Sequence, residues 1–273
     1  MTLQGMGTKP DDLGGSAANL TRYERVASGG SKGNQTKWYR DGIWYKADFL
    51  GYEGLAECIC SKLLKASNVR SYVQYAPVYI TETDSGREFL GCMSRDFGTF
   101  ASGDVILLHL PEKYNVWLNP TGSPATDLSV FCQGVKQVFG ADIIEDMKVM
   151  MQFDMIVGNE DRILRNFGLK QVGSGYEFAP LFDHGLSLLS DNTSPNRAES
   201  IDEIIYHPFS CEREKGNGLN ELGIIPIVID TQQFFCEMVS VPVYPKEAAD
   251  AALRILRRSL DETEGKLWTK PKH

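Results

Sequence analysis

Three side chains in the middle of the chain have the chemistry of a phosphoryl-transfer site. Asp161 and Asn166 stand five positions apart in "GNEDRILRNFG", and Asp183 follows in "PLFDHG". In such a site a carboxylate orients the attacking hydroxyl, while an Asn and a second carboxylate hold Mg²⁺ against the phosphates. Asn and Asp also favour turns, so each residue alone is equally compatible with a surface loop. The set becomes informative only if the fold brings it to one place.

A glycine-rich stretch near the N-terminus could contact a triphosphate. "SGGSKGNQTK" has little Cβ obstruction, so backbone N–H groups can approach phosphate oxygens. It lacks the G-x-x-x-x-G-K-[ST] pattern of a Walker loop. A flexible linker is the alternative reading. The predicted contacts are Ser28, Gly29, Gly30, Ser31, Lys32 and Gly33.

Lys46 lies mid-strand in "WYKAD", among aromatic residues, where a positive charge needs a partner. The next helical segment offers Glu53 and Glu57, one turn apart on one face. A strand lysine paired with a helix glutamate below a glycine-rich loop is typical of the N-terminal half of a protein-kinase site. The spacing leaves the choice between the two glutamates open.

Two kinds of secondary structure are expected to position these residues. Residues 23–95 read mostly as β-structure with one helix, including a tight "RDG" turn and a hairpin around "TDSGRE". Residues 96–273 read as helical, with helices in 124–140, 141–158 and 245–260 and a hairpin around "VGSG". Residues 1–22 read as a flexible leader. The sequence therefore predicts an α+β protein with a β-rich N-lobe and a helical C-lobe.

Four motifs, taken in order, resemble the HipA-like kinases, including small serine/threonine kinases of the HipA/CtkA type. These are "SGGSKGNQTK", "WYKAD" followed by "YEGLAE", "GNEDRILRNFG" and "PLFDHG", and the resemblance covers roughly residues 25 to 210. It implies a bilobal protein-kinase-like fold and ATP- and Mg²⁺-dependent phosphorylation of Ser or Thr.

The resemblance also implies roles for individual residues. Lys46 would contact the ATP phosphates, Asp161 would be the catalytic base, and Asn166 and Asp183 would bind Mg²⁺. It slightly favours Glu53 as the partner of Lys46. Backbone groups near Met93 and Arg95, in the expected hinge "GCMSRDF", would meet adenine.

This chain departs from the family pattern in three places. Ile163 stands where the family often has His, and Asp183-His184-Gly185 replaces D-F-G. The chain also begins almost directly at the glycine-rich loop, without the extra N-terminal subdomain of the larger HipA toxins. The first difference removes a His near the phosphates, the second keeps the metal ligand but not the Phe of D-F-G, and the third favours a minimal kinase.

Several functional expectations follow from the resemblance. We expect autophosphorylation, with Ser28 and Ser31 as candidates, a protein substrate with Ser or Thr, and an antitoxin-like regulator among the partners. Residues 186–200 could form a regulatory segment or an ordinary surface loop. A small-molecule kinase and a non-catalytic nucleotide-binding scaffold are the alternative functions.

The bulk composition limits the remaining classes. The formal net charge is −8, which argues against general nucleic-acid binding because that function requires a basic surface. No ordinary secretory signal and no apolar run long enough to span a membrane is visible. We expect a cytoplasmic protein, and export as an effector stays open.

Overall fold

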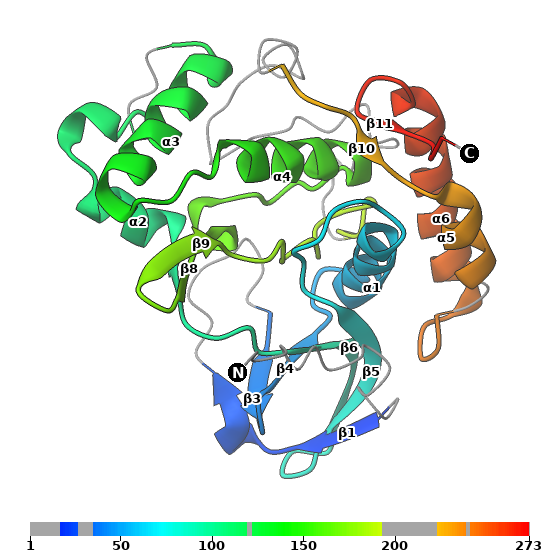
Figure 1. Cartoon of the computed structure of the whole chain (residues 1–273). Coiled ribbons are helices and arrows are strands. Elements are labelled where there is room, and N and C mark those ends of the chain that lie inside the picture. Colours follow the sequence, from blue (N-terminus) through cyan, green and yellow to red (C-terminus); the bar gives the residue numbers. More distant parts are fainter. Residues whose placement is uncertain (1–16, 27–34, 119–121, 193–222, 239–240, 273) are drawn as a thin grey trace, which may run out of the picture.

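The computed structural model describes residues 17–26, 35–118, 122–192, 223–238 and 241–272. Strands of the N-terminal part gather at one end of the molecule, and most helices gather at the other (Figure 1). Helix α1 (Glu53–Lys65) lies between the two ends. The predicted α+β organisation with a β-rich N-lobe and a helical C-lobe is confirmed.

A six-stranded sheet with the order β1-β5-β6-β4-β3-β2 builds the N-lobe. The strands are β1 (Ala17–Leu20), β2 (Arg25–Val26), β3 (Lys37–Arg40), β4 (Ile43–Ala47), β5 (Tyr75–Glu82) and β6 (Arg87–Arg95). The β5–β6 hairpin forms around "TDSGRE", as predicted. Asp41 and Gly42 both have positive φ, which is typical of the predicted tight turn between β3 and β4.

The predicted leader is wrong at its C-terminal end. Residues 17–20 form β1, which pairs in parallel with β5. Ala18 and Leu20 alternate with exposed neighbours and are buried in the N-lobe, so the strand gains apolar contacts as well as backbone hydrogen bonds. Residues 1–16 lie outside the described residues.

The two faces of β4 serve different purposes. Tyr45 and Ala47 pack into a small apolar cluster with Trp38 and other N-lobe side chains. Because side chains alternate along a strand, Trp44 and Lys46 share the opposite face. That face looks toward α1 and the space between the lobes.

The C-lobe holds most of the apolar core. Its helices are α2 (Gly103–His109), α3 (Pro124–Phe139), α4 (Ile144–Val157), α5 (Thr231–Glu237) and α6 (Lys246–Thr263), with 3₁₀ turns at Arg22–Glu24 in the N-lobe and at Glu112–Tyr114 and Leu164–Asn166. Strands β7 (Phe100–Ser102), β8 (Gly168–Val172) and β9 (Gly175–Phe178) form a small sheet, and β10 (Ile227–Val228) pairs with β11 (Trp268–Thr269).

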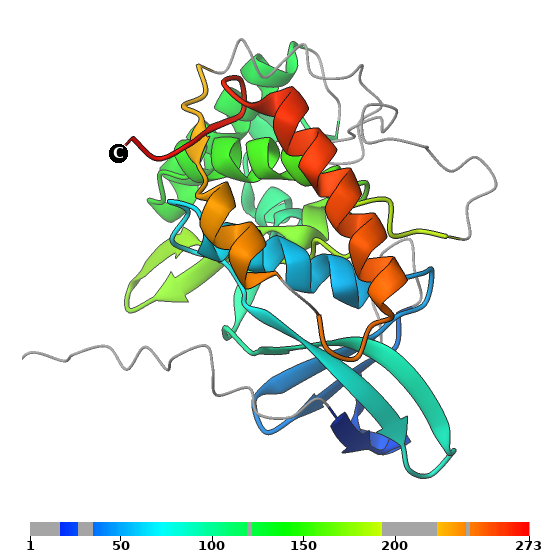
Figure 2. The same ribbon diagram turned by 90° about the vertical axis from the view of Figure 1, so that its right-hand side faces the viewer.

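The predicted helices 124–140, 141–158 and 245–260 are confirmed as α3, α4 and α6. Gly140 and Gly158 end α3 and α4 in the left-handed conformation. Helix α6 packs against α4 and lies beside α5 on the outside of the C-lobe (Figure 2). No helix in the described part of the chain is long and apolar enough to cross a membrane.

Candidate active site

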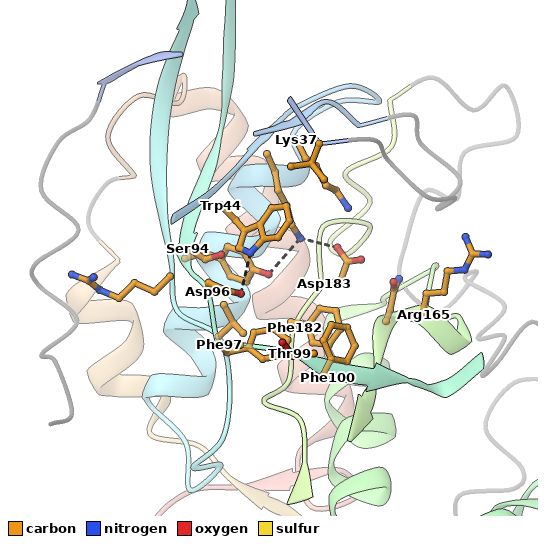
Figure 3. A pocket seen from close by; sticks show the side chains of 17 residues that line it. Lys37, Trp44, Ser94, Asp96, Phe97, Thr99, Phe100, Arg165, Phe182 and Asp183 are labelled. Carbon is orange, nitrogen blue, oxygen red and sulfur yellow. Dashed lines mark hydrogen bonds and ion pairs between the residues drawn. The ribbon is translucent and has the colours of Figure 1, made fainter. Parts of the chain in front are cut away.

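A cavity of about 520 Å³ lies between the two lobes. Lys37, Trp44, Lys46 and Tyr75 line it from the N-lobe, while Arg165, Asn166, Phe182 and Asp183 line it from the C-lobe. Its third wall runs through the connection between the lobes, from Ser94 to Phe100 (Figure 3). The cavity therefore brings together residues from both halves of the chain.

Lys46 joins the two lobes through a pair of carboxylates. Its Nζ lies 2.7 Å from Glu57 Oε1 and 2.9 Å from Asp183 Oδ1. The contact with Asp183 is one of the dashed lines in Figure 3. Burial alone would lower the pKa of Lys46, but Asp183 and Glu57 together raise that pKa well above its ordinary value. Lys46 therefore stays protonated and can bind an anion.

Glu57, and not Glu53, is the partner of Lys46, so the slight preference for Glu53 is wrong. Glu53 is the first residue of α1, and its carboxylate accepts backbone N–H groups of Phe49, Leu50 and Gly51 in the preceding loop. Glu57 lies one turn further and faces β4. Its second oxygen accepts the His184 backbone N–H at 2.9 Å, which ties α1 to the D-H-G motif.

Asp183 is held in an uncommon backbone conformation, with φ of 61°. Non-glycine residues rarely adopt this region, and such positions cluster at functional sites. Burial would raise the pKa of Asp183, but Lys46 and, more weakly, Lys37 lower it below its ordinary value. The Asp183 carboxylate is therefore ionised beside the cavity.

Asp161, Asn166 and Asp183 converge, as the sequence predicted. All three line a second cavity of about 30 Å³, whose wall also includes Glu53 and Leu186. The Asn166 amide nitrogen donates to the Asp161 backbone carbonyl at 2.7 Å, and this bond fixes the orientation of the amide. Asp161 and Asn166 from the loop after α4 and Asp183 of the D-H-G motif thus share one small volume.

A buried ion pair that we did not anticipate organises this loop. Arg162 donates from Nε to Asp154 Oδ2 at 2.7 Å and from Nη2 to Oδ1 at 2.9 Å. Arg162 Nη1 also donates to the backbone carbonyls of Asn166 and Phe182. Asn159 donates to the same Asp154 carboxylate at 2.8 Å. One arginine therefore connects α4, the loop that follows it and the residue before Asp183.

His184 has a structural environment. Burial, together with the nearby Arg162, lowers the pKa of His184 to about 3, so the ring is neutral. The ring packs edge-on against Phe153 at a centroid distance of 5.1 Å.

The segment after the D-H-G motif is docked against the loop before α1. Tyr52 donates its hydroxyl to the Leu188 and Leu189 carbonyls at 2.8 and 3.1 Å. Gly51 forms a bridge to Asp191, and a Cβ on Gly51 would lie only 2.0 Å from the Ser190 carbonyl oxygen. Of the segment 186–200, residues up to 192 are described, and these are fixed to the N-lobe.

Other predicted nucleotide contacts have different outcomes. Ser28 to Gly33 lie outside the described residues. Arg95 lines the larger cavity, whereas Met93 packs into the N-lobe cluster and does not line it. Lys37, Trp44 and Arg165 line the cavity, and we did not single them out from the sequence.

The donor set fits a magnesium ion bound together with phosphates. Asp183 supplies an ionised carboxylate and Asn166 an amide oxygen, and both residues border both cavities. No group of three or more His, Cys, Asp or Glu suitable for a metal occurs within the described ranges. Mg²⁺ often takes one or two protein ligands and completes its shell with water and phosphate oxygens, so Asn166 and Asp183 are sufficient in number.

Comparison with known proteins supports the fold. The chain matches no protein-family model and no curated protein by sequence. Its structure is similar to that of the Helicobacter pylori proinflammatory kinase CtkA, with a TM-score of 0.56 and 15% identity over 89% of this chain and 94% of CtkA.

A second similar structure is HipA from a Shewanella oneidensis MR-1 toxin–antitoxin system, solved with HipB and operator DNA. The TM-score is 0.52, with 14% identity over 87% of this chain and 64% of HipA. This chain therefore has the bilobal kinase-like fold of CtkA and HipA, and it spans only 64% of the HipA chain.

Proposed function

We propose that the chain is an ATP- and Mg²⁺-dependent protein kinase that phosphorylates Ser or Thr, including residues of its own chain. The observation that carries this proposal is Lys46 paired with both Glu57 and Asp183 in the interlobe cavity, close to Asp161 and Asn166. Phosphoryl transfer needs a lysine that is held by a helix glutamate. It also needs, on the opposite side, a carboxylate that can act as base and two residues that can bind Mg²⁺.

The chain's own residues would divide the work. Lys46, with Lys37 opposite it on β3, would bind phosphate oxygens from the N-lobe side. Asn166 and Asp183 would hold Mg²⁺, which supplies positive charge at the phosphates. Asp161 would accept a hydrogen bond from the acceptor hydroxyl, orient it, and take its proton. The hydroxyl oxygen would bond to the γ-phosphorus while the bond from that phosphorus to the bridging oxygen breaks and ADP leaves.

Binding of the nucleotide requires one exchange of partners. Lys46 and Asp183 now neutralise each other at 2.9 Å, although one would bind phosphate and the other metal. The Lys46–Glu57 bond can persist because Glu57 also accepts the His184 N–H and belongs to a fully buried part of α1. Glu57 would therefore keep Lys46 in place, which would leave the Asp183 carboxylate available to hold Mg²⁺.

A regulator is the second part of the proposal. HipA was solved with HipB and operator DNA. We propose a protein regulator of the antitoxin kind for this chain also, supported only by the shared fold.

The proposal is tested by incubating the purified protein with labelled ATP, Mg²⁺ and a generic protein substrate. Asp161→Asn should reduce phosphoryl transfer about 10²–10⁴-fold, because general base catalysis has this magnitude, while ATP affinity changes little. Asp183→Asn should make ATP affinity insensitive to Mg²⁺. Asp84→Asn, an exposed change on the N-lobe, is the matched control.

The products distinguish the alternatives. Mass gain on the protein itself or on the protein substrate supports the proposal. Label found only on added small molecules would indicate a small-molecule kinase, and ATP binding without turnover would indicate a scaffold. Full activity of Asp161→Asn would contradict the assigned base.

A further inference from the structure

Trp44 has a position in the cavity that no phosphate chemistry explains. It lies two residues before Lys46 on the same face of β4 and lines the cavity from the N-lobe. Its indole Nε1 donates to Asp96 Oδ1 at 3.1 Å, in the connection between the lobes. Its ring also contacts Tyr39 at a centroid distance of 4.9 Å. The indole is therefore held from two sides, with its orientation fixed.

Three phenylalanines occupy the other side of the same cavity. Phe97, Phe100 and Phe182 form a mutual cluster, with centroid distances of 5.2 to 5.3 Å. Figure 3 shows these rings on the C-lobe side and Trp44 on the N-lobe side. Phe182 directly precedes Asp183 in the chain, so the aromatic part of the cavity adjoins the Asp183 carboxylate.

The polar groups around the indole are already used. Asp96 accepts the indole N–H, and the Asp96 backbone N–H donates to the Gly42 carbonyl at 2.9 Å. What Trp44 offers a ligand is therefore its flat π-face. Nucleobases stack on such faces, and aromatic-to-alanine changes at stacking sites weaken binding by roughly tenfold or more.

We infer that a purine base of the bound nucleotide stacks on Trp44, and that Asp96 is a positioning residue that fixes the indole for this contact. The inference rests on the proposed function only for the ligand class, a nucleoside triphosphate. It requires binding and no phosphoryl transfer. A purine has a larger π-surface than a pyrimidine, so the site should prefer ATP to CTP.

Intrinsic fluorescence tests the inference directly. The chain has four tryptophans, and Trp38, Trp117 and Trp268 are all buried, at most 9% exposed. Quenching by added MgATP should therefore come from Trp44 and disappear in Trp44→Phe, which should retain most of its affinity because it keeps an aromatic ring.

Calorimetry measures the contribution of the base. Trp44→Ala should lose about tenfold in ATP affinity and lose the preference for ATP over CTP, while its affinity for Mg²⁺-tripolyphosphate, which has no base, stays unchanged. Tyr23→Ala, at an exposed aromatic outside the cavity, is the control. Equal ATP affinity in Trp44→Ala and the wild type would overturn the inference.

Asp96 is tested by rescue. Asp96→Ala should lower ATP affinity about threefold and shift the Trp44 emission, whereas Asp96→Asn, which can still accept the indole N–H, should restore both. A lack of rescue would remove the positioning role.

The wild-type protein separates this inference from the proposed function. ATP binding with quenching but without turnover would overturn the kinase proposal alone. A wild type that binds no ATP would overturn both the kinase proposal and the stacking on Trp44.

Discussion

Lys46 and Arg162 are both buried cations that face carboxylates, yet their surroundings differ. The Arg162 side chain is 1% exposed, and its planar donors meet both Asp154 oxygens and two backbone carbonyls. The Lys46 side chain is 11% exposed, borders the cavity, and meets single oxygens of Glu57 and Asp183. Arg162 is enclosed within the C-lobe, whereas the partners of Lys46 come from both lobes.

This difference separates a structural ion pair from an exchangeable one. A guanidinium fork satisfied on all sides has no donor to give a ligand, and its rigid geometry suits a permanent connection. A lysine ammonium is a point charge that can change partners, and the cavity gives a ligand access to it. Burial of a charge therefore does not identify a reactive group, but burial beside a cavity with partners on two elements does.

The largest expected effect on stability comes from breaking the Arg162–Asp154 ion pair. Arg162→Met should lower the free energy of unfolding by about 3–5 kcal/mol, because it leaves the Asp154 carboxylate buried without a cation. Urea denaturation followed by circular dichroism measures this. Arg162→Lys should remain destabilised, since lysine cannot make the bidentate contact.

The control Arg165→Met removes an exposed ion pair with Asp104 and should cost less than about 1 kcal/mol. Similar losses in both variants would refute the contrast.

Substitutions of the two glutamates of α1 should differ in their effect on phosphoryl transfer. Glu57→Gln should reduce phosphoryl transfer about 10–100-fold, because Lys46 loses its charged partner, and it should also lower stability, because the hydrogen bond from the His184 N–H is weakened. Glu53→Gln should leave the Lys46 pair intact and cost about 1–2 kcal/mol of stability, because it weakens the hydrogen bonds to the loop N–H groups. Steady-state kinetics and thermal denaturation of both proteins check this. The reverse pattern would restore Glu53 as the functional partner.

The last comparison concerns Asp48, a half-buried carboxylate with no cationic partner among the described residues. It accepts the Gly54 N–H and the Tyr244 hydroxyl, and burial raises its pKa to about 7. A raised pKa means that the group favours folding most at low pH, below its unfolded pKa near 4, and that this contribution is lost as pH rises through 7.

Asp48→Asn should therefore be more stable than the wild type by about 1–2 kcal/mol at pH 8, since it removes the cost of ionising a partly screened carboxylate. The difference should shrink toward pH 5. Melting temperatures measured from pH 5 to 9 test this, with Asp84→Asn as an exposed control. A constant difference across this range would mean that Asp48 is not the titrating group.

The sequence was sufficient to predict the main elements and the convergence of Asp161, Asn166 and Asp183, because their spacing and the adjoining helix and hairpin leave few arrangements. It could not choose between Glu53 and Glu57. Both lie on one helix face, and the choice depends on where α1 begins and on which loop amides need an acceptor.

Other features gave weaker signals. Arg162 and Asp154 are charged residues in a loop and a helix, and their burial depends on packing between elements distant in the chain. Met93 lies in a strand with buried residues on both faces, so alternation does not reveal which side chains face the cavity. Trp44 could have been found, because it is two residues from Lys46 and must share its face.

The Lys46–Asp183 pair also has a consequence for synthesis of the chain. Glu57 lies 11 positions after Lys46, whereas Asp183 lies 137 positions after it. At a ribosomal rate of about 5–20 residues per second, Asp183 is made about 7–27 s after Lys46. During that interval the nascent N-lobe can form only the Glu57 half of the arrangement. The active site is therefore completed late, when the C-lobe has emerged.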